Sequence, residues 1–300
     1  MPLRLLGGTG HPALLDATAH ALGIAPEERV LERFPDGELH VVLRRTQTAT
    51  HVIIVQPTGP PVDEHLVELV MLADAAKHAG AARVTAVMPY FGYARQDHRG
   101  TAGEAIAAKT IARMIEAAGI DELIVVDPHS PALEAMFDIL VHTLSAVPIL
   151  AAALHPFGGD DAVVVAPDLG AVKLAERYAA ALDLPVAVVR KTRLSGETVH
   201  AVDLVGDVRD RRPLIVDDMI TTAGTIEAAA RALLDRGCRP ELVVAATHGL
   251  FVGPAQSRLA ELPLRRVLVT DTVPTSASDL PLSIISIVGL LADALTSLTQ

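Results

Sequence analysis

Two neighbouring carboxylates precede a run of small hydroxyl-bearing residues within one continuous stretch, residues 214–225. The residues that would form a site here are Asp217, Asp218, Thr221, Thr222, Ala223, Gly224 and Thr225. Because the run has no bulky side chain, several backbone N–H groups can converge on an anion, and a following helix adds partial positive charge. Carboxylates would repel a phosphate but suit sugar hydroxyls or a divalent cation. The stretch therefore predicts a site for a phosphorylated sugar, with an ordinary turn between a strand and a helix as the alternative.

An expected strand and an expected helix would hold this stretch. Residues 213–216 are apolar and mostly β-branched, which predicts a buried strand opened by a proline. Residues 226–236 place apolar side chains on one face, and Glu227 lies four residues before Arg231, which predicts a helix with a surface ion pair. Gly237 can adopt the left-handed conformation that ends many helices.

A second cluster of functional side chains follows the expected strand 84–88. Three aromatic residues lie between residues 90 and 93, in a chain with only 3 tyrosines and 5 phenylalanines. Arg95 is a planar cation that can stack on a base or clamp a phosphate, and Gln96 can both donate and accept hydrogen bonds. These residues could instead pack a corner of the fold. A helix is expected next, over residues 104–118.

A turn is predicted before the expected strand 39–43, because the sequence Pro-Asp-Gly favours a turn. Phe34 would offer a face on which a base can stack. Asp36 and Glu38, on either side of Gly37, would offer acceptors for an adenine amino group or ligands for a hydrated metal. A turn without any binding role is the alternative.

Two more polar residues follow expected strands. His129 comes after strand 123–126, where it could bind a metal or simply pack at the surface. Asp168 comes after strand 161–166, where open α/β sheets place their ligands, but it could equally cap the next helix.

A cationic segment follows the expected strand 186–189. Lys191 is one of four lysines in the chain and is flanked by Arg190 and, two residues on, by Arg193. Such a lysine in a loop at the mouth of a sheet could clamp an anion, or could simply face solvent.

Composition limits the class of protein. Half of the 300 residues are hydrophobic, tryptophan is absent and the formal net charge is -11. This balance is typical of an aliphatic α/β protein and argues against nucleic-acid binding, which needs a broad basic face. The single cysteine, Cys238, cannot form an intrachain disulfide. Residues 282–298 are short for a membrane span and the N-terminus lacks a signal-peptide pattern, so we expect a cytoplasmic protein without a membrane partner.

Taken together and in order, these segments resemble the ribose-phosphate diphosphokinase family, also called phosphoribosyl diphosphate synthetase, over nearly the whole chain. The matching segments are residues 34–38, 93–97, 127–129, 167–170, 191–193, 217–225 and 246–249. The resemblance implies an α/β fold of two tandem phosphoribosyltransferase type I-like domains with mainly parallel sheets flanked by helices. Residues 1–146 would be the ATP-binding side and 147–284 the ribose 5-phosphate-binding side. Residues 285–300 would form a terminal helix that packs back on the first domain.

The resemblance also implies an activity and roles for single residues. The family transfers the diphosphoryl group of ATP to ribose 5-phosphate, uses Mg²⁺, and assembles as homo-oligomers built from dimers. The residues implied to bind ATP are Phe34, Asp36, Gly37, Glu38, Arg95, Gln96 and Asp97. Those implied for ribose 5-phosphate are Arg193, Asp217, Asp218, Thr221, Thr222, Ala223, Gly224 and Thr225. His129 and Asp168 would serve the metal, and Lys191 with Arg193 would be catalytic.

Two departures from the common family pattern change the expectations. Thr221 stands where the common forms carry an aspartate, so a base role for that position is not carried over. Residues 100–104 replace an arginine-rich segment that serves allosteric control, and residues 103–106 look more like the archaeal branch. We therefore expect weak allosteric inhibition by ADP. A phosphoribosyltransferase and a non-catalytic regulatory paralogue remain the alternative functions.

Overall fold

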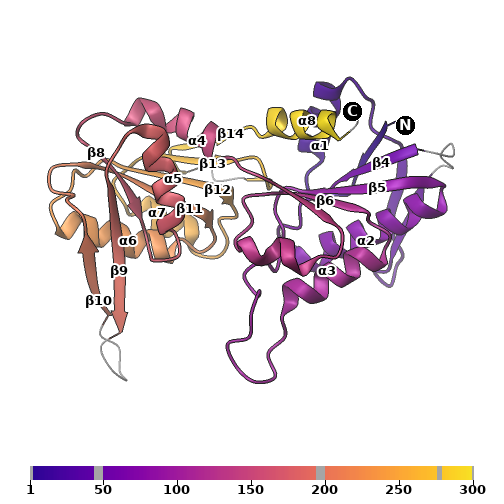
Figure 1. The fold of residues 1–300 in the computed structure, drawn as a ribbon, viewed down its shortest axis with the longest axis horizontal. Helices are drawn as coiled ribbons and strands as arrows, with labels where there is room; N and C mark the ends of the chain where they lie inside the picture. Colours follow the sequence, from indigo (N-terminus) through magenta and orange to yellow (C-terminus); the bar gives the residue numbers. More distant parts are fainter. Residues whose placement is uncertain (1–2, 44–49, 194–199, 276–278, 299–300) are drawn as a thin grey trace. The chain divides into compact units, whose positions relative to one another are not determined.

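The computed structural model of the chain describes residues 3–43, 50–193, 200–275 and 279–298. They form two compact units, which are described one at a time (Figure 1). Unit 1 consists of Met1–Ser145, Thr272–Pro274 and Ile287–Gln300, and unit 2 of Ala146–Asp271 and Thr275–Ser286. The chain thus returns to unit 1 for its last helix.

A parallel sheet forms the centre of unit 1. Within the described residues its strand order is β1-β4-β5-β6-β7. The strands are β1 (Leu3–Gly7), β4 (Thr50–Val55), β5 (Ala81–Met88), β6 (Glu122–Val126) and β7 (Leu140–Leu144). β4 is buried along its whole length, as expected for a continuous apolar strand that is covered on both faces.

Helices cover both faces of this sheet (Figure 1). They are α1 (Pro12–Leu22), α2 (Val62–His78), α3 (Ala107–Ala117) and α8 (Val288–Ser297), with a short 3₁₀ helix η1 (Pro131–Met136) after β6. The apolar sides of α2 and α3 share one core with alternate residues of the strands. α1 and α8 pack against each other on the opposite face. The helix expected over residues 104–118 begins only at Ala107, because Glu104 instead accepts hydrogen bonds from the preceding loop.

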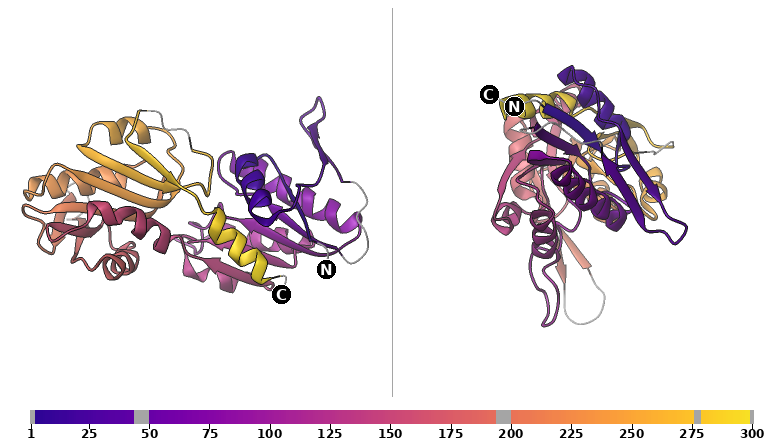
Figure 2. Two further views of the ribbon diagram at one scale, coloured as in Figure 1. Left: turned by 90° about the horizontal axis from the view of Figure 1, so that it is seen from above. Right: turned by 90° about the vertical axis from the view of Figure 1, so that its right-hand side faces the viewer.

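A separate hairpin projects from unit 1 (Figure 2). It pairs β2 (Arg29–Arg33) with β3 (Leu39–Leu43) in antiparallel register, and β3 contacts α2. The sequence patterns predicted only the second of these strands. The first has the sequence Arg-Val-Leu-Glu-Arg, which lacks a strict alternation of apolar and polar residues, and both of its faces are partly exposed.

The sheet of unit 2 has the order β10-β9-β8-β11-β12-β13-β14 among the described residues, and every pair is parallel except β10 with β9. The strands are β8 (Ala162–Ala166), β9 (Val186–Arg193), β10 (His200–Val205), β11 (Arg212–Ile220), β12 (Leu242–Gly249), β13 (Leu264–Thr270) and β14 (Leu282–Ile285). Two parallel α/β units of this kind confirm the predicted fold class.

The helices of unit 2 also cover both faces of its sheet. They are α4 (Val147–Leu154), α5 (Val172–Leu182), α6 (Gly224–Asp235) and α7 (Ala255–Ala260), with a 3₁₀ turn η2 (His155–Phe157). α6 and α7 share one core with the sheet, and Cys238 is buried in it. α4 and α5 contact each other and strands β8 and β12. None of the helices in the described residues has the length and apolar character needed to span a membrane.

Candidate functional site

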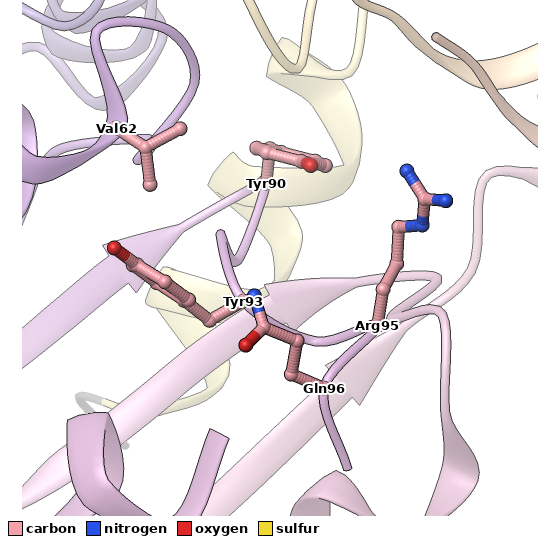
Figure 3. A pocket seen from close by; sticks show the side chains of 5 residues that line it. All are labelled: Val62, Tyr90, Tyr93, Arg95 and Gln96. Atoms are coloured by element: carbon pink, nitrogen blue, oxygen red, sulfur yellow. The ribbon is translucent and has the colours of Figure 1, made fainter. Parts of the chain in front are cut away.

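A pocket of about 460 Å³ opens at the carboxyl end of β5 in unit 1. Its lining residues are Val62, Tyr90, Tyr93, Arg95 and Gln96. Val62 opens helix α2, and the other four belong to the segment that follows β5. Figure 3 shows these side chains around the hollow, with Val62 and Arg95 on opposite sides of the view. The structure therefore brings Arg95 and Gln96 together with the predicted aromatic cluster.

Hydrogen bonds fix the shape of this segment. Tyr93 has a left-handed backbone with φ 69°, a conformation that is uncommon for residues other than glycine. Its hydroxyl donates to Oδ1 of Asp63 in the first turn of α2, and this bond raises the pKa of Tyr93. The carbonyl of Tyr93 accepts from the backbone N–H of Gln96 at 2.9 Å. Two residues that line the pocket, Tyr93 and Gln96, are thus hydrogen-bonded to each other, and Tyr93 is also bonded to α2.

Asp97 connects the pocket segment to the residues after β6. A hydrogen bond from the Ser130 hydroxyl and the ring of His98, whose Nδ1 lies 2.5 Å from Oδ1, together lower the pKa of Asp97. The Ser130 hydroxyl also caps η1 by accepting from the N–H of Ala132 at 3.2 Å. His129, the residue before Ser130, is exposed. Asp97 and His129 therefore lie in neighbouring segments of unit 1.

The predicted nucleotide-binding turn lies at the tip of the hairpin. The N–H of Glu38 donates to Oδ1 of Asp36 at 3.1 Å, and Gly37 has a φ of 95° that favours glycine. The ring of Phe34 stacks on His40 with centroids 5.0 Å apart, and 47% of Phe34 is exposed. None of these turn residues lines the pocket, so unit 1 by itself does not unite the two predicted parts of the ATP site.

In unit 2 the carboxylate pair belongs to a strand and not to the loop after it. β11 was expected to end at residue 216, but it continues to Ile220 because β12 also continues to Gly249 and pairs with it. Asp217 is opposite Ala246 in this pairing. The expected loop shortens to residues 221–223, since α6 begins at Gly224.

Asp217 at this strand end lies near two other carboxylates, those of Asp218 and Asp168. Burial, followed by the charge of Asp218 and a smaller effect of Asp168, raises the pKa of Asp217 well above its usual range. Oδ1 of Asp217 accepts from the N–H of Asp218 at 2.9 Å. Oδ1 of Asp168 accepts from the N–H groups of Gly170 and Ala171 at 2.9 and 3.2 Å, so it fixes the turn before α5. The expected N-cap role is wrong, because Ala171 is the N-cap of α5 and no side chain caps that helix. The sequence suggested no link between Asp168 and Asp217, because 49 residues separate them (217 − 168).

The small-residue loop leads directly into the N-terminus of α6. Ala223 has a left-handed backbone with φ 59°, and Gly224 starts the helix. Nη1 of Arg258 on α7 donates to the carbonyl of Thr222 at 3.0 Å, while its Nε lies 3.3 Å from Oε2 of Glu227. Arg258 was not predicted as part of the site, and its position in a separate short helix gives no signal in the sequence.

The predicted ion pair and stop signal of α6 are confirmed. Arg231 donates to Glu227 at 2.8 Å, and Gly237 has a φ of 79°.

Lys191 and Arg193 lie in β9, where a loop was expected. The strand continues past Val189 because β10 pairs with it in antiparallel register, with Lys191 opposite Val202 and Arg193 opposite His200. The side chains of both residues lie outside the described part of the structure.

Comparisons with known proteins match both halves of the chain. Residues 3–119 match the family described as the N-terminal domain of ribose phosphate pyrophosphokinase, and residues 146–273 match the phosphoribosyl transferase domain. The chain is 39% identical to a ribose-phosphate pyrophosphokinase of Gloeobacter violaceus over 98% of this chain and 89% of that protein. It is 40% identical to one from Caldanaerobacter subterraneus subsp. tengcongensis over 91% of this chain and 86% of that protein. The crystal structure of a phosphoribosylpyrophosphate synthetase from Mycobacterium smegmatis superposes with a TM-score of 0.92 and 34% identity, covering 100% of this chain and 99% of that one.

Proposed function

Because the chain belongs to the ribose-phosphate pyrophosphokinase family, we propose that it is an ATP-dependent ribose-phosphate diphosphokinase. It transfers the diphosphoryl group of ATP to the anomeric hydroxyl of ribose 5-phosphate, giving 5-phosphoribosyl 1-diphosphate and AMP for nucleotide biosynthesis. The observation that carries this function is the match to a relative of that name over 98% of the chain at 39% identity. In the reaction the anomeric oxygen bonds to the β-phosphorus, the hydroxyl proton is released, and AMP leaves with the bridging oxygen.

Unit 1 supplies the ATP-binding side of this proposal, and the proposed domain spans residues 1–146. Its support is a pocket that combines aromatic rings with a cation and an amide, the groups that suit a base and its phosphates. We assign ATP binding to Arg95, Gln96 and Asp97 at this pocket. The turn residues Phe34, Asp36, Gly37 and Glu38 complete the assignment.

Unit 2 supplies the sugar side, with the proposed domain spanning residues 147–284, and the proposed terminal segment 285–300 contains helix α8 (Val288–Ser297). A loop that opens a helix presents N–H groups to a phosphate, and carboxyls beside it can bind ribose hydroxyls. We assign ribose 5-phosphate binding to Arg193, Asp217, Asp218, Thr221, Thr222, Ala223, Gly224 and Thr225. Support for this assignment comes from the left-handed Ala223, which turns the chain into α6, and from the position of Asp217, whose pKa burial raises, at the strand end before this loop.

Catalysis is assigned to Lys191 and Arg193. Phosphoryl transfer needs positioning and neutralisation of charge more than covalent help from the protein. Negative charge spreads over the transferred group and the departing AMP as the bond to the bridging oxygen breaks. Two cationic side chains that meet this charge stabilise the transition state.

Mg²⁺ is the proposed cofactor, with His129 and Asp168 as its protein ligands. No group of three or more His, Cys, Asp or Glu side chains suited to a metal occurs among the described residues. Mg²⁺ commonly takes only one or two carboxylates and completes its shell with water and substrate phosphates, so it needs few protein ligands. The mutual repulsion of Asp168 and Asp217 also fits a site that a cation would relieve. When bound, Mg²⁺ would supply positive charge to the triphosphate.

The two alternative functions account for less of the chain. A phosphoribosyltransferase would explain residues 146–273 but not the separate match over residues 3–119. A non-catalytic regulatory paralogue would explain the fold, but the intact cations at Lys191 and Arg193 argue against it.

Phosphorus NMR tests the proposal directly. Purified protein with Mg²⁺, ATP and ribose 5-phosphate should yield AMP and a diphosphorylated sugar without any added base. A requirement for a nucleobase would support the phosphoribosyltransferase, and inactivity with all three components would support the regulatory paralogue.

We also propose that allosteric inhibition by ADP is weak, as in the archaeal-like branch of the family. The relatives reported above are bacterial, so the assignment to the archaeal-like branch rests only on the sequence of residues 103–106. Glu104 supports the proposal, because its carboxylate accepts from the N–H groups of Gly100 and Thr101 at 2.7 and 2.9 Å. These backbone donors of the loop are thus bonded within the loop. Inhibition by ADP should be competitive with ATP, and steep non-competitive inhibition would overturn the proposal.

Two further properties belong to the proposal. We expect a homo-oligomer built from dimers, which sedimentation velocity would measure, and a cytoplasmic location, which cell fractionation would test.

A further inference from the structure

Thr58 lies beneath the nucleotide pocket, in the connection between β4 and α2, and is 1% exposed. Its hydroxyl donates to the carbonyl of Tyr90 at 3.2 Å and accepts from the N–H of Gly92 at 2.8 Å. Its own N–H also donates to the Tyr90 carbonyl, at 3.0 Å. One buried side chain therefore satisfies two backbone groups of the segment that carries the pocket.

The segment has little room to take another position. A Cβ at Gly92 would lie 2.7 Å from the carbonyl oxygen of Thr58 and 2.7 Å from Cγ1 of Val62, so only glycine allows this approach. Movement away from Thr58 would leave the buried N–H of Gly92 without its acceptor, which is costly in the protein interior. The orientation of Tyr90 to Gln96 thus depends on the Thr58 hydroxyl.

The connection that carries Thr58 is itself braced. Nδ1 of His65 lies 2.7 Å from the carbonyl oxygen of Gly59. Nε2 of Gln56 donates to the carbonyl of His65 at 3.1 Å and to Oε2 of Glu68 at 2.9 Å. Gln56, His65 and Glu68 are all buried. Their hydrogen bonds therefore hold the connection that carries Thr58 in place independently of the segment that lines the pocket.

We propose that Thr58 is a positioning residue for the nucleotide pocket, acting through the backbone of Tyr90 and Gly92. It does not line the pocket, so it contributes to ATP affinity only by fixing the residues that do. The inference rests on the proposed function, because it takes the pocket to bind ATP. Loss of the hydroxyl should weaken ATP binding while the sugar site in unit 2 remains intact.

Steady-state kinetics of three variants test this role. Thr58→Val keeps the shape but removes the hydroxyl, and should raise KM for ATP roughly 10- to 100-fold with kcat and KM for ribose 5-phosphate changed less than about 3-fold. Thr58→Ser keeps the hydroxyl and should stay within about 3-fold of the wild type. Thr18→Val is the matched control, because Thr18 is also fully buried in unit 1 but its Oγ1 has no hydrogen-bond partner.

Tyrosine fluorescence measures ATP binding without turnover. The chain has no tryptophan and 3 tyrosines, of which Tyr90 and Tyr93 line the pocket, while Tyr178 is buried in unit 2. Titration with Mg²⁺ and ATP should change the emission of the wild type, and Thr58→Val should need a roughly 10- to 100-fold higher ATP concentration. If the wild type binds ATP but forms no product, the proposed function fails, whereas this titration still decides the role of Thr58.

Two results would overturn the inference. One is that Thr58→Val matches Thr18→Val in both KM for ATP and the fluorescence titration. The other is that Thr58→Ser loses ATP affinity as fully as Thr58→Val. If Thr58→Val fails to fold, comparison of Thr58→Ala with Thr58→Ser isolates the hydroxyl in smaller side chains. Equal KM for ATP in that pair counts against the role.

Discussion

The two candidate sites are held in place by different means. In unit 1, a pocket of about 460 Å³ is lined mainly by side chains of one segment, which donates hydrogen bonds to Thr58 and Asp63. In unit 2, the candidate site is a strand end and a helix start, where the buried Asp217 lies near Asp218 and Asp168 and the left-handed Ala223 leads into α6. The first site depends on tertiary contacts between segments, whereas most of the second depends on one continuous stretch.

This contrast predicts that a variant in one unit changes KM for one substrate and leaves KM for the other substrate nearly unchanged. Changes to the anchors of unit 1 should affect ATP, and changes at the end of β11 should affect ribose 5-phosphate. Only residues that act on the transition state should lower kcat while leaving KM for both substrates nearly unchanged.

The largest effect is expected for Lys191→Ala. Removing a preorganised cation costs about 10²- to 10³-fold in kcat, with both KM values nearly unchanged. Lys77→Ala is the control, because Lys77 pairs with Asp121 at 2.7 Å in unit 1 and takes no part in either site. Initial rates at saturating substrates measure the effect. Wild-type kcat in Lys191→Ala would show that its cation does not act in the transition state.

Asp217→Asn should affect the sugar site alone. Loss of a hydrogen bond to a ribose hydroxyl should raise KM for ribose 5-phosphate roughly 10-fold, while KM for ATP stays within about 2-fold. A titration of each substrate at saturating concentrations of the other separates the two values. Equal effects on both KM values would mean that the sites are not divided between the units as proposed.

The same variant should change how stability depends on pH. The pKa of Asp217 in the folded protein lies above its unfolded value, so the carboxyl favours folding when protonated, and this contribution is lost as pH rises through the folded pKa. Asparagine cannot ionise. The Tm of Asp217→Asn relative to the wild type should therefore increase as pH rises above the ordinary aspartate pKa of about 4, by on the order of 2–4 °C for each kcal/mol.

Differential scanning fluorimetry across that range measures the Tm difference. Asp235→Asn, which changes an exposed carboxylate at the end of α6, is the control for removing one carboxylate from unit 2. A Tm difference that does not vary with pH in Asp217→Asn would contradict a raised pKa of Asp217.

Arg258→Ala tests whether unit 2 also needs a tertiary anchor. It removes the donor to the Thr222 carbonyl and should raise KM for ribose 5-phosphate about 3- to 10-fold. Arg231→Ala is closely matched, because Arg231 also pairs with Glu227 but makes no bond to the loop. A similar KM in both variants would show that the contact with Glu227, and not the one with Thr222, matters.

The smallest effect is expected for Tyr93→Phe. It removes one exposed hydrogen bond to Asp63 and should raise KM for ATP about 2- to 5-fold. Asp63→Asn and the double variant complete a cycle that measures the coupling. Strictly additive effects would show that the two side chains act on ATP binding independently.

Much of the fold was predictable because its signals are local. The apolar strands, the α6 ion pair and the stop at Gly237 depend on residues that are close in sequence. Strand ends were less predictable: β11 continues through Asp217 and β9 through Arg193 because neighbouring strands pair with them. Consecutive polar residues such as Asp217 and Asp218 interrupt the apolar pattern by which a strand is predicted. Only the pairing with the partner strand therefore shows where the strand ends.

By itself, the sequence determined two α/β units with mainly parallel sheets and the family, and it predicted a sugar-phosphate site at residues 217–225, since these follow from periodicity and from motifs within single segments. Tertiary structure alone decided that Thr58 and Asp63 hydrogen-bond to the segment lining the pocket of unit 1, and that Arg258 donates to the Thr222 carbonyl. It also decided that burial, with smaller effects of Asp218 and Asp168, raises the pKa of Asp217. Apart from the effect of Asp218, each of these interactions joins residues from different elements. The energies of these interactions depend on the distance between the side chains in space and on their burial. Neither quantity can be read from how far apart the residues are in the sequence.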